Sequence, residues 1–130
     1  MRKKIFISLK NLVTELNQLS KSTIVIHCHG CIDLLHIGHI KYFQEAKSMG
    51  NVLIVTITPD RYLNKGPGRP AFNEKHRAEA IAALDIVDFV AINKWPTAIE
   101  TIKLLKPDLY VKGPDYKDYK DDVTGNINLE

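Results

Sequence analysis

The stretch GCIDLLHIGH, residues 30–39, follows the β-branched run TIVI at residues 23–26. Such a run, when it meets glycine and then a helical pattern, predicts a strand, a tight turn and the start of a helix. The N–H groups at a helix N-terminus have no partners inside the helix and carry the positive end of its dipole, so they attract phosphate oxygens. This stretch therefore predicts a phosphate site.

Two histidines stand at the predicted helix start. His36 and His39 are three positions apart, which places both imidazoles on one face of the helix. Gly38 lies between them and lets a ligand come close to the backbone. A modest shift makes imidazole a cationic donor to an oxyanion near neutral pH, so we expect the pair to act during attack on a phosphate. The alternative is a histidine pair that only caps the helix.

Strands and helices are predicted to alternate along the chain. A strand, a helix and a second buried strand form a right-handed crossover, so the strands are parallel and ligands bind at their carboxyl ends. The predicted fold class is therefore α/β, a Rossmann-like doubly wound parallel sheet in three α/β/α layers, with residues 1–130 as a single domain. The expected strands cover 23–27, 51–57, 87–92 and 108–111, and the expected helices cover 8–19, 37–49, a segment capped by Asn73, and 97–105.

The helix predicted at residues 37–49 has an apolar face and a polar face. It is expected to end at Gly50, because glycine is common just after the last turn of a helix. Its expected inward side chains are Ile40, Phe43 and Ala46, and its expected solvent-facing side chains are Lys41, Gln44 and Lys47.

Composition limits the classes of partner. The 130 residues are 45% hydrophobic, and the Lys and Arg residues behind the net charge of +3 are dispersed along the chain. We therefore expect no nucleic-acid partner. No apolar run approaches the ~20 residues of a membrane span, and the N-terminal residues include no small-residue cleavage site. We expect no membrane partner and a cytoplasmic location.

Cys28 and Cys31 form a CxxC, which in a cytosolic α/β protein can support thiol redox chemistry. A thiol oxidoreductase is therefore one alternative function. His27 and His29 beside the two cysteines are candidate metal ligands, but successive residues of a strand point to opposite faces, so we expect no structural zinc and no metal-ligating side chains here. The simpler interpretation of Cys28 is a buried strand residue.

Residues 30–39 resemble the GxFDxxHxGH signature of the HxGH nucleotidylyltransferases, a cytidylyltransferase-like family. The one departure is Ile32, which stands where the family has phenylalanine and keeps an apolar side chain there. The resemblance extends from about Ile5 to Asn126. It implies that His36 and His39 are catalytic and that the nucleotide is bound by Gly30, Cys31, Ile32, Gly38 and Arg77.

Two breaker-rich loops are predicted on the ligand side. Residues 65–70, KGPGRP, lie in a loop that in the resembling family reaches over the nucleotide and supplies a phosphate-binding lysine, which matches Lys65. Arg77 falls in the first turn of the next helix, where arginine is unfavourable for the dipole, so we expect it to point at an anion. Residues 112–116, KGPDY, resemble the KGxDY of enzymes that nucleotidylate sugar phosphates, particularly heptose phosphate. The resemblance implies a catalytic Lys65 and substrate contacts from Asp33, Arg69, Lys112 and Asp115.

The resemblance implies that the chain is a nucleotidyltransferase. The expected reaction moves a nucleotidyl group, AMP from ATP, to a sugar phosphate such as heptose 1-phosphate and releases pyrophosphate. Mg²⁺ is the expected cofactor, at the leaving group, and the expected partners are these small molecules and, as an option, a second copy in a homodimer. The alternatives are a CTP-dependent cytidylyltransferase that acts on a small phosphorylated alcohol, and a nucleotide-binding domain without turnover.

One departure from the resembling family concerns the C-terminal part. Family members carry a serine-rich ISTS-like segment whose hydroxyls also bind the triphosphate, and this chain stops before such a segment. We therefore expect a domain that lacks it. Residues 115–130 are polar and are expected to form a disordered tail.

Overall fold

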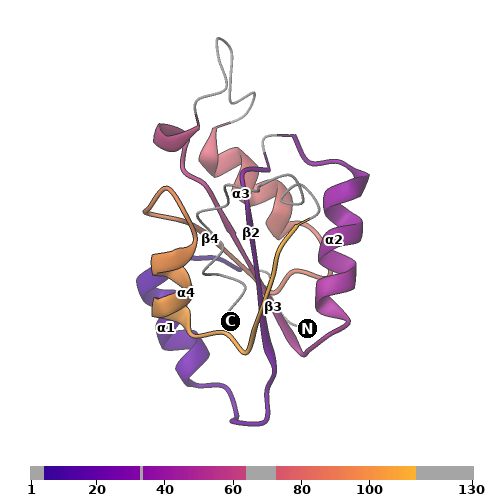
Figure 1. Cartoon of the computed structure of the whole chain (residues 1–130), viewed down its shortest axis with the longest axis vertical. Helices are drawn as coiled ribbons and strands as arrows, with labels where there is room; N and C mark the ends of the chain where they lie inside the picture. Colours follow the sequence, from indigo (N-terminus) through magenta and orange to yellow (C-terminus); the bar gives the residue numbers. More distant parts are fainter. Residues whose placement is uncertain (1–4, 33, 64–72, 114–130) are drawn as a thin grey trace.

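A computed structural model describes residues 5–32, 34–63 and 73–113 of the chain (Figure 1). Five strands form one parallel sheet in the order β1-β4-β3-β2-β5. The predicted Rossmann-like α/β architecture is therefore confirmed. The elements are β1 (Ile5–Phe6), α1 (Leu9–Asn17), β2 (Val25–Gly30), α2 (Ile37–Lys47), β3 (Val52–Ile57), the 3-10 turn η1 (Asp60–Tyr62), α3 (Glu74–Ala82), β4 (Phe89–Ile92), α4 (Ile99–Leu105) and β5 (Leu109–Val111).

The sheet packs an apolar layer against each of its faces. Helices α1 and α4 lie on one side of the sheet and α2 lies on the other (Figure 1). Helix α3 shares its buried cluster with α2, and that cluster includes Phe43 of α2 and Ile81 of α3. The second cluster joins Leu9 and Leu12 of α1 to Leu105 of α4. Because both faces are covered, all six residues of β3 are buried, as expected of a central parallel strand.

The strand order reverses between β2 and β5. The chain runs from β2 to β3 and β4 on one side, and β5 then returns to pair with β2 on the other side, with Cys28 opposite Val111. Ligands of doubly wound sheets bind at the carboxyl ends of the strands at such a switch point. Residues 30–39 leave β2 at this place, so the fold puts the signature stretch where a ligand is expected.

Two details of the elements differ from the sequence prediction. Strand β1 was not predicted, because two residues are too few to show a period, yet Ile5 pairs with Phe89. The predicted end of the second helix at Gly50 is wrong, since α2 ends at Lys47 and is capped by Ser48. A Cβ at Gly50 would lie 2.8 Å from the Ile24 carbonyl oxygen, so glycine is needed there for a close backbone approach.

No helix in the described ranges is long and apolar enough to cross a membrane.

The prediction that Lys47 faces solvent is also wrong. Its Nζ lies 2.7 Å from Oδ2 of Asp88, a carboxylate that is only 3% exposed. The same oxygen accepts a hydrogen bond of 2.8 Å from the Leu53 N–H. A buried carboxylate needs a cationic partner, and the long lysine stem can reach it from the helix surface. Asp88 thus joins α2, β3 and the start of β4.

Replacing Asp88 by alanine should lower the free energy of unfolding by about 3 kcal/mol, because it leaves the buried Leu53 N–H and the Lys47 ammonium without their partner. Urea denaturation followed by circular dichroism measures the loss. Asp88→Asn is the matched control: it keeps an acceptor for Leu53 and should lose clearly less. Equal losses in the two variants would show that the hydrogen bond to Leu53 contributes nothing.

Candidate active site

The turn after β2 contains a residue in an unusual conformation. Ile32 has φ 47°, in the left-handed region, which costs a β-branched residue about 1–2 kcal/mol. Its side chain is 5% exposed and belongs to the apolar cluster under α2 and α3. Burial of the side chain offsets the strain. The apolar side chain expected at this position of the turn is therefore buried in the core. The turn is also pinned to β3, since the Thr58 N–H donates to the Gly30 carbonyl at 3.0 Å.

The two signature histidines cap the start of α2 reciprocally. Nδ1 of His36 accepts from the Gly38 N–H at 3.0 Å, and Nδ1 of His39 accepts from the His36 N–H at 3.2 Å. Their ring centroids are 4.0 Å apart. Because both Nδ1 atoms accept, the hydrogen bonds assign the proton of each neutral ring to Nε2. The pair therefore caps the helix, and each ring carries its N–H on Nε2.

Gly38 has a steric reason to be glycine. A Cβ at this position would lie 2.7 Å from Cε1 of the His36 ring. Any larger residue would displace the imidazole that accepts from the Gly38 N–H. The sequence predicted this glycine as a place of close ligand approach, and the structure adds close approach of a catalytic candidate.

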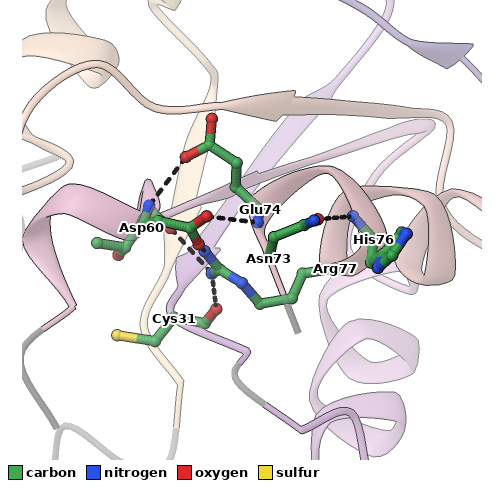
Figure 2. Close-up of polar contacts among 7 residues, drawn as sticks. Cys31, Asp60, Asn73, Glu74, His76 and Arg77 are labelled. Atoms are coloured by element: carbon green, nitrogen blue, oxygen red, sulfur yellow. Dashed lines mark hydrogen bonds and ion pairs between the residues drawn. The ribbon is translucent and has the colours of Figure 1, made fainter. Parts of the chain in front are cut away.

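Arg77 reaches the signature turn from the first turn of α3 (Figure 2). Its guanidinium donates to the carbonyl oxygens of Cys31 at 2.7 Å and Thr58 at 2.9 Å. The other terminal nitrogen lies 2.6 Å from Oδ1 of Asp60. Arg77 was predicted to point at an anion, and the Asp60 carboxylate is an anion that it contacts. Its contact with a nucleotide stays a prediction.

Lys112 follows β5 at the same edge of the sheet. Val111, the residue before it, pairs with Cys28 of β2, and the Val111 carbonyl accepts a hydrogen bond of 2.5 Å from the Tyr42 hydroxyl of α2. The carboxyl ends of β2 and β5 thus lie side by side, and Arg77 of α3 contacts the turn that follows β2. Four further site predictions lie outside the described residues: Asp33, Lys65, Arg69 and Asp115.

The two cysteines do not have the properties of a redox pair. Both are free thiols. Cys28 is a buried strand residue, as the simpler interpretation predicted, and burial raises the pKa of its thiol to about 12. The attacking thiol of an oxidoreductase needs a lowered pKa, so Cys28 is unsuited to that role. Within residues 5–32, 34–63 and 73–113, no three His, Cys, Asp or Glu side chains gather as a metal site would require.

A buried polar row lies next to the site and was not predicted. His27 Nε2 and His29 Nδ1 each lie 2.8 Å from the hydroxyl oxygen of Thr56. This hydroxyl has one proton, so it donates to one imidazole and accepts from the other. Burial lowers the pKa of His27 to about 3, with a further contribution from His29, and lowers that of His29 to about 4. The available signal was the alternation of two histidines on a buried strand.

A pocket of about 480 Å³ lies between the signature turn and α3. It was also not predicted, because its walls come from segments far apart in the sequence. Its lining residues are Ile32, Leu34, Leu35, His76, Arg77, Glu79 and Ala80.

A parallel sheet whose signature turn feeds a helix N-terminus with two imidazole donors defines a nucleotide-handling site of the nucleotidyltransferase class. The comparisons with known proteins agree. A family model described as cytidylyltransferase-like matches residues 27–129. The chain therefore belongs to the cytidylyltransferase-like family. The family resemblance expected from residues 30–39 is confirmed.

Curated relatives include the bifunctional protein HldE of two bacteria. The protein from Aliarcobacter butzleri is 41% identical over 116 residues, which cover 88% of this chain and 24% of the relative. The protein from Campylobacter jejuni subsp. doylei is 45% identical over 113 residues, which cover 85% of this chain and 24% of the relative. The chain thus spans about a quarter of the length of these relatives.

Two solved structures are similar. The lipopolysaccharide core biosynthesis protein from Thermoplasma volcanium is 30% identical, with a TM-score of 0.70 over 82% of this chain and 88% of that one. Pantoate-beta-alanine ligase from Francisella tularensis is 19% identical, with a TM-score of 0.62 over 83% of this chain and 56% of that one. The second likeness concerns the fold alone.

Proposed function

We propose that this domain transfers AMP from ATP to a sugar phosphate such as heptose 1-phosphate, with release of pyrophosphate. The observation that carries the proposal is the pair of Nε2–H donors that His36 and His39 present at the N-terminus of α2. The sugar-phosphate acceptor is supported by the KGPDY sequence at residues 112–116 and by similarity to a protein named for lipopolysaccharide core biosynthesis.

The reaction needs charge stabilisation more than covalent catalysis. An oxygen of the acceptor phosphate forms a new bond to the α-phosphorus, and the bond from that phosphorus to the oxygen that bridges to the β-phosphate breaks. Phosphoryl-type transition states are loose and spread negative charge over oxygens, so positioned donors and cations lower the barrier. In this proposal the two histidines donate to the phosphate oxygens, and the nucleotide lies against Gly30, Cys31, Ile32, Gly38 and Arg77.

Mg²⁺ is the proposed cofactor. The described residues offer no three-ligand cluster for it, and Mg²⁺ prefers phosphate oxygens and water to a cage of side chains. We therefore propose that the ion is bound mainly by the oxygens of the triphosphate. When bound, the ion supplies positive charge to the departing pyrophosphate.

We further propose a cytoplasmic location and substrate contacts from Asp33, Arg69, Lys112 and Asp115. A homodimer stays a prediction, which light scattering of the purified chain tests.

The function is tested with the purified chain, Mg²⁺, and either ATP or CTP. Each nucleotide is paired with heptose 1-phosphate, with another sugar phosphate, or with a small phosphorylated alcohol, and pyrophosphate release is measured. The proposal expects release with ATP and a sugar phosphate, and an ADP-sugar by mass spectrometry. Release only with CTP and a phosphorylated alcohol would favour the cytidylyltransferase alternative. Nucleotide binding in calorimetry without release from any pair would favour a binding domain.

Lys65 is the proposed cation that follows the phosphates during the reaction. Lys65→Ala should lower turnover about tenfold, which corresponds to about 1.4 kcal/mol of transition-state stabilisation, and should leave the free energy of unfolding unchanged. The matched control is Lys75→Ala, which removes an exposed lysine on α3. Steady-state pyrophosphate release measures both variants. Normal turnover of Lys65→Ala would assign Lys65 to the solvated surface.

A further inference from the structure

We infer that Asp60 and Arg77 form a clamp that holds the signature turn in its working conformation, so that Arg77 acts on the reaction through the Cys31 carbonyl. This inference rests on the proposed function and names a positioning role within the same site. Asp60 is then not required to touch the substrate, and this role of Arg77 is separate from its proposed contact with the nucleotide. The clamp consists of Arg77, Asp60 and Glu74, together with the carbonyls of Cys31 and Thr58.

Arg77 has its charged group directed into the protein. The side chain is 1% exposed. One terminal nitrogen donates to both the Cys31 and Thr58 carbonyls, and the other meets the Asp60 carboxylate. These three acceptors come from the signature turn, the end of β3 and η1. A planar guanidinium can serve several fixed acceptors at once, whereas a lysine ammonium is a point charge on a flexible stem.

Asp60 connects this guanidinium to the start of α3 (Figure 2). Its Oδ2 accepts from the Glu74 N–H at 3.1 Å, and in return Oε1 of Glu74 accepts from the Asp60 N–H at 2.9 Å. A carboxylate at the first turn of a helix also stabilises the positive end of the helix dipole. Asp60 therefore holds Arg77 in place with one oxygen and the helix that carries Arg77 with the other.

A hydrogen bond to the Cys31 carbonyl can fix the backbone conformation of the signature turn. This carbonyl belongs to the planar peptide unit between Cys31 and Ile32, and the orientation of this plane sets φ of Ile32. That φ is 47°, a strained value that a contact from outside the turn helps to hold, in addition to burial of the Ile32 side chain. Arg77 supplies the contact at 2.7 Å. The turn then leads to His36, whose backbone N–H and ring both take part in the histidine cap.

The first test uses Asp60→Asn and Arg77→Lys in the full chain. Each should lower kcat for pyrophosphate release about tenfold, with a smaller change in KM, because small misplacements of catalytic groups act mainly on the chemical step. Arg61→Lys is the matched control, because Arg61 is exposed and lies next to Asp60 in the chain. The contacts described for Arg61 are a hydrogen bond to the Lys94 carbonyl and stacking on the Tyr62 ring. The kinetics of Arg61→Lys should be normal.

A second readout does not depend on activity. Cys31 is half-buried in the turn, whereas Cys28 is fully buried in β2. Alkylation with iodoacetamide, followed by peptide mass spectrometry, should show faster labelling of Cys31 in Asp60→Asn and Arg77→Lys, with Cys28 still protected. Unchanged labelling of Cys31 together with reduced kcat would overturn the clamp, because Arg77 would then act by direct contact with the substrate. Faster labelling in a chain that never releases pyrophosphate would uphold the clamp and reject the proposed function.

The backbone argument has its own test. In the Asp60→Asn background, Ile32→Gly and Ile32→Ala both remove the apolar contacts of Ile32 beyond Cβ, but only glycine adopts a positive φ without strain. The clamp expects Ile32→Gly to recover a several-fold higher kcat than Ile32→Ala in that background, and a much smaller difference between the two when Asp60 is intact. The same ratio in both backgrounds would contradict a clamp that works by holding φ of Ile32. Because both members of each comparison share the same loss of packing, the ratio is independent of their lower stability.

Discussion

His39→Ala is expected to lower pyrophosphate release by about 10²–10³-fold, the usual effect of removing one donor to developing charge. The structure supplies the reason, since the Nδ1 atom of His39 accepts from the His36 N–H, which assigns the ring proton to Nε2. Steady-state kinetics with saturating ATP and sugar phosphate measures the loss. Nearly normal turnover would remove His39 from the mechanism.

The capping and catalytic roles of His39 can be separated. Glutamate at the third position of a helix can accept from the backbone N–H of the cap residue, as the His39 ring does here, and its carboxylate has no N–H to donate. His39→Glu should therefore keep the thermal stability that His39→Ala loses, while its turnover stays as low as that of alanine. Recovery of turnover in His39→Glu would mean that capping, and not donation to phosphate, is what the reaction requires.

The domain is expected to lose stability already at mildly acidic pH. His27 and His29 are buried as neutral groups, and burial lowers their pKa from 6.5 to about 3 and about 4. Below pH 6.5 the unfolded chain binds protons that the folded chain excludes, so the free energy of unfolding falls as the pH falls. Each histidine contributes up to about 1.4 kcal/mol per pH unit. The fall continues down to the folded pKa of each group.

Urea titrations between pH 6.5 and about 4 measure this slope. The double variant His27→Gln, His29→Gln should flatten it, because neither glutamine takes up a proton. The exposed His76 is the control, and His76→Gln should leave the slope as it is. A steep slope that persists in the double variant would assign acid unfolding to other groups.

The sequence was sufficient for the central features because they depend on local patterns. A β-branched run, a glycine and a helical period predicted β2, the turn and α2, and the spacing of His36 and His39 predicted that both rings lie on one face. Asn73 was predicted as a helix cap, and its side chain does accept from the His76 N–H. Each of these inferences needs only residues that are close in sequence.

The features that were not predicted depend on contacts between distant segments. The Lys47 ammonium meets a buried carboxylate that lies 41 residues away in the chain. Arg77 was expected to point at an anion, but nothing local showed that Cys31 and Asp60 would both contact it. Likewise, Thr56 joins His27 and His29 only because β2 and β3 pair in a register that sets His29 opposite it. Pairing of this kind is a property of the tertiary fold.

The pairing of β1 with β4 bears on how the chain acquires its structure. Ile5 and Phe6 lie at the start of the chain, yet their partners are Phe89 and Val90. Closing so long a loop is entropically costly, and contacts of this kind slow folding. During synthesis from the N-terminus, β1 is made well before β4 and has to wait for it. The outer edge of β4 therefore stays unpaired in the nascent chain until β1 docks. During this interval the unpaired edge can pair with a strand of another chain, so the risk of aggregation is highest then.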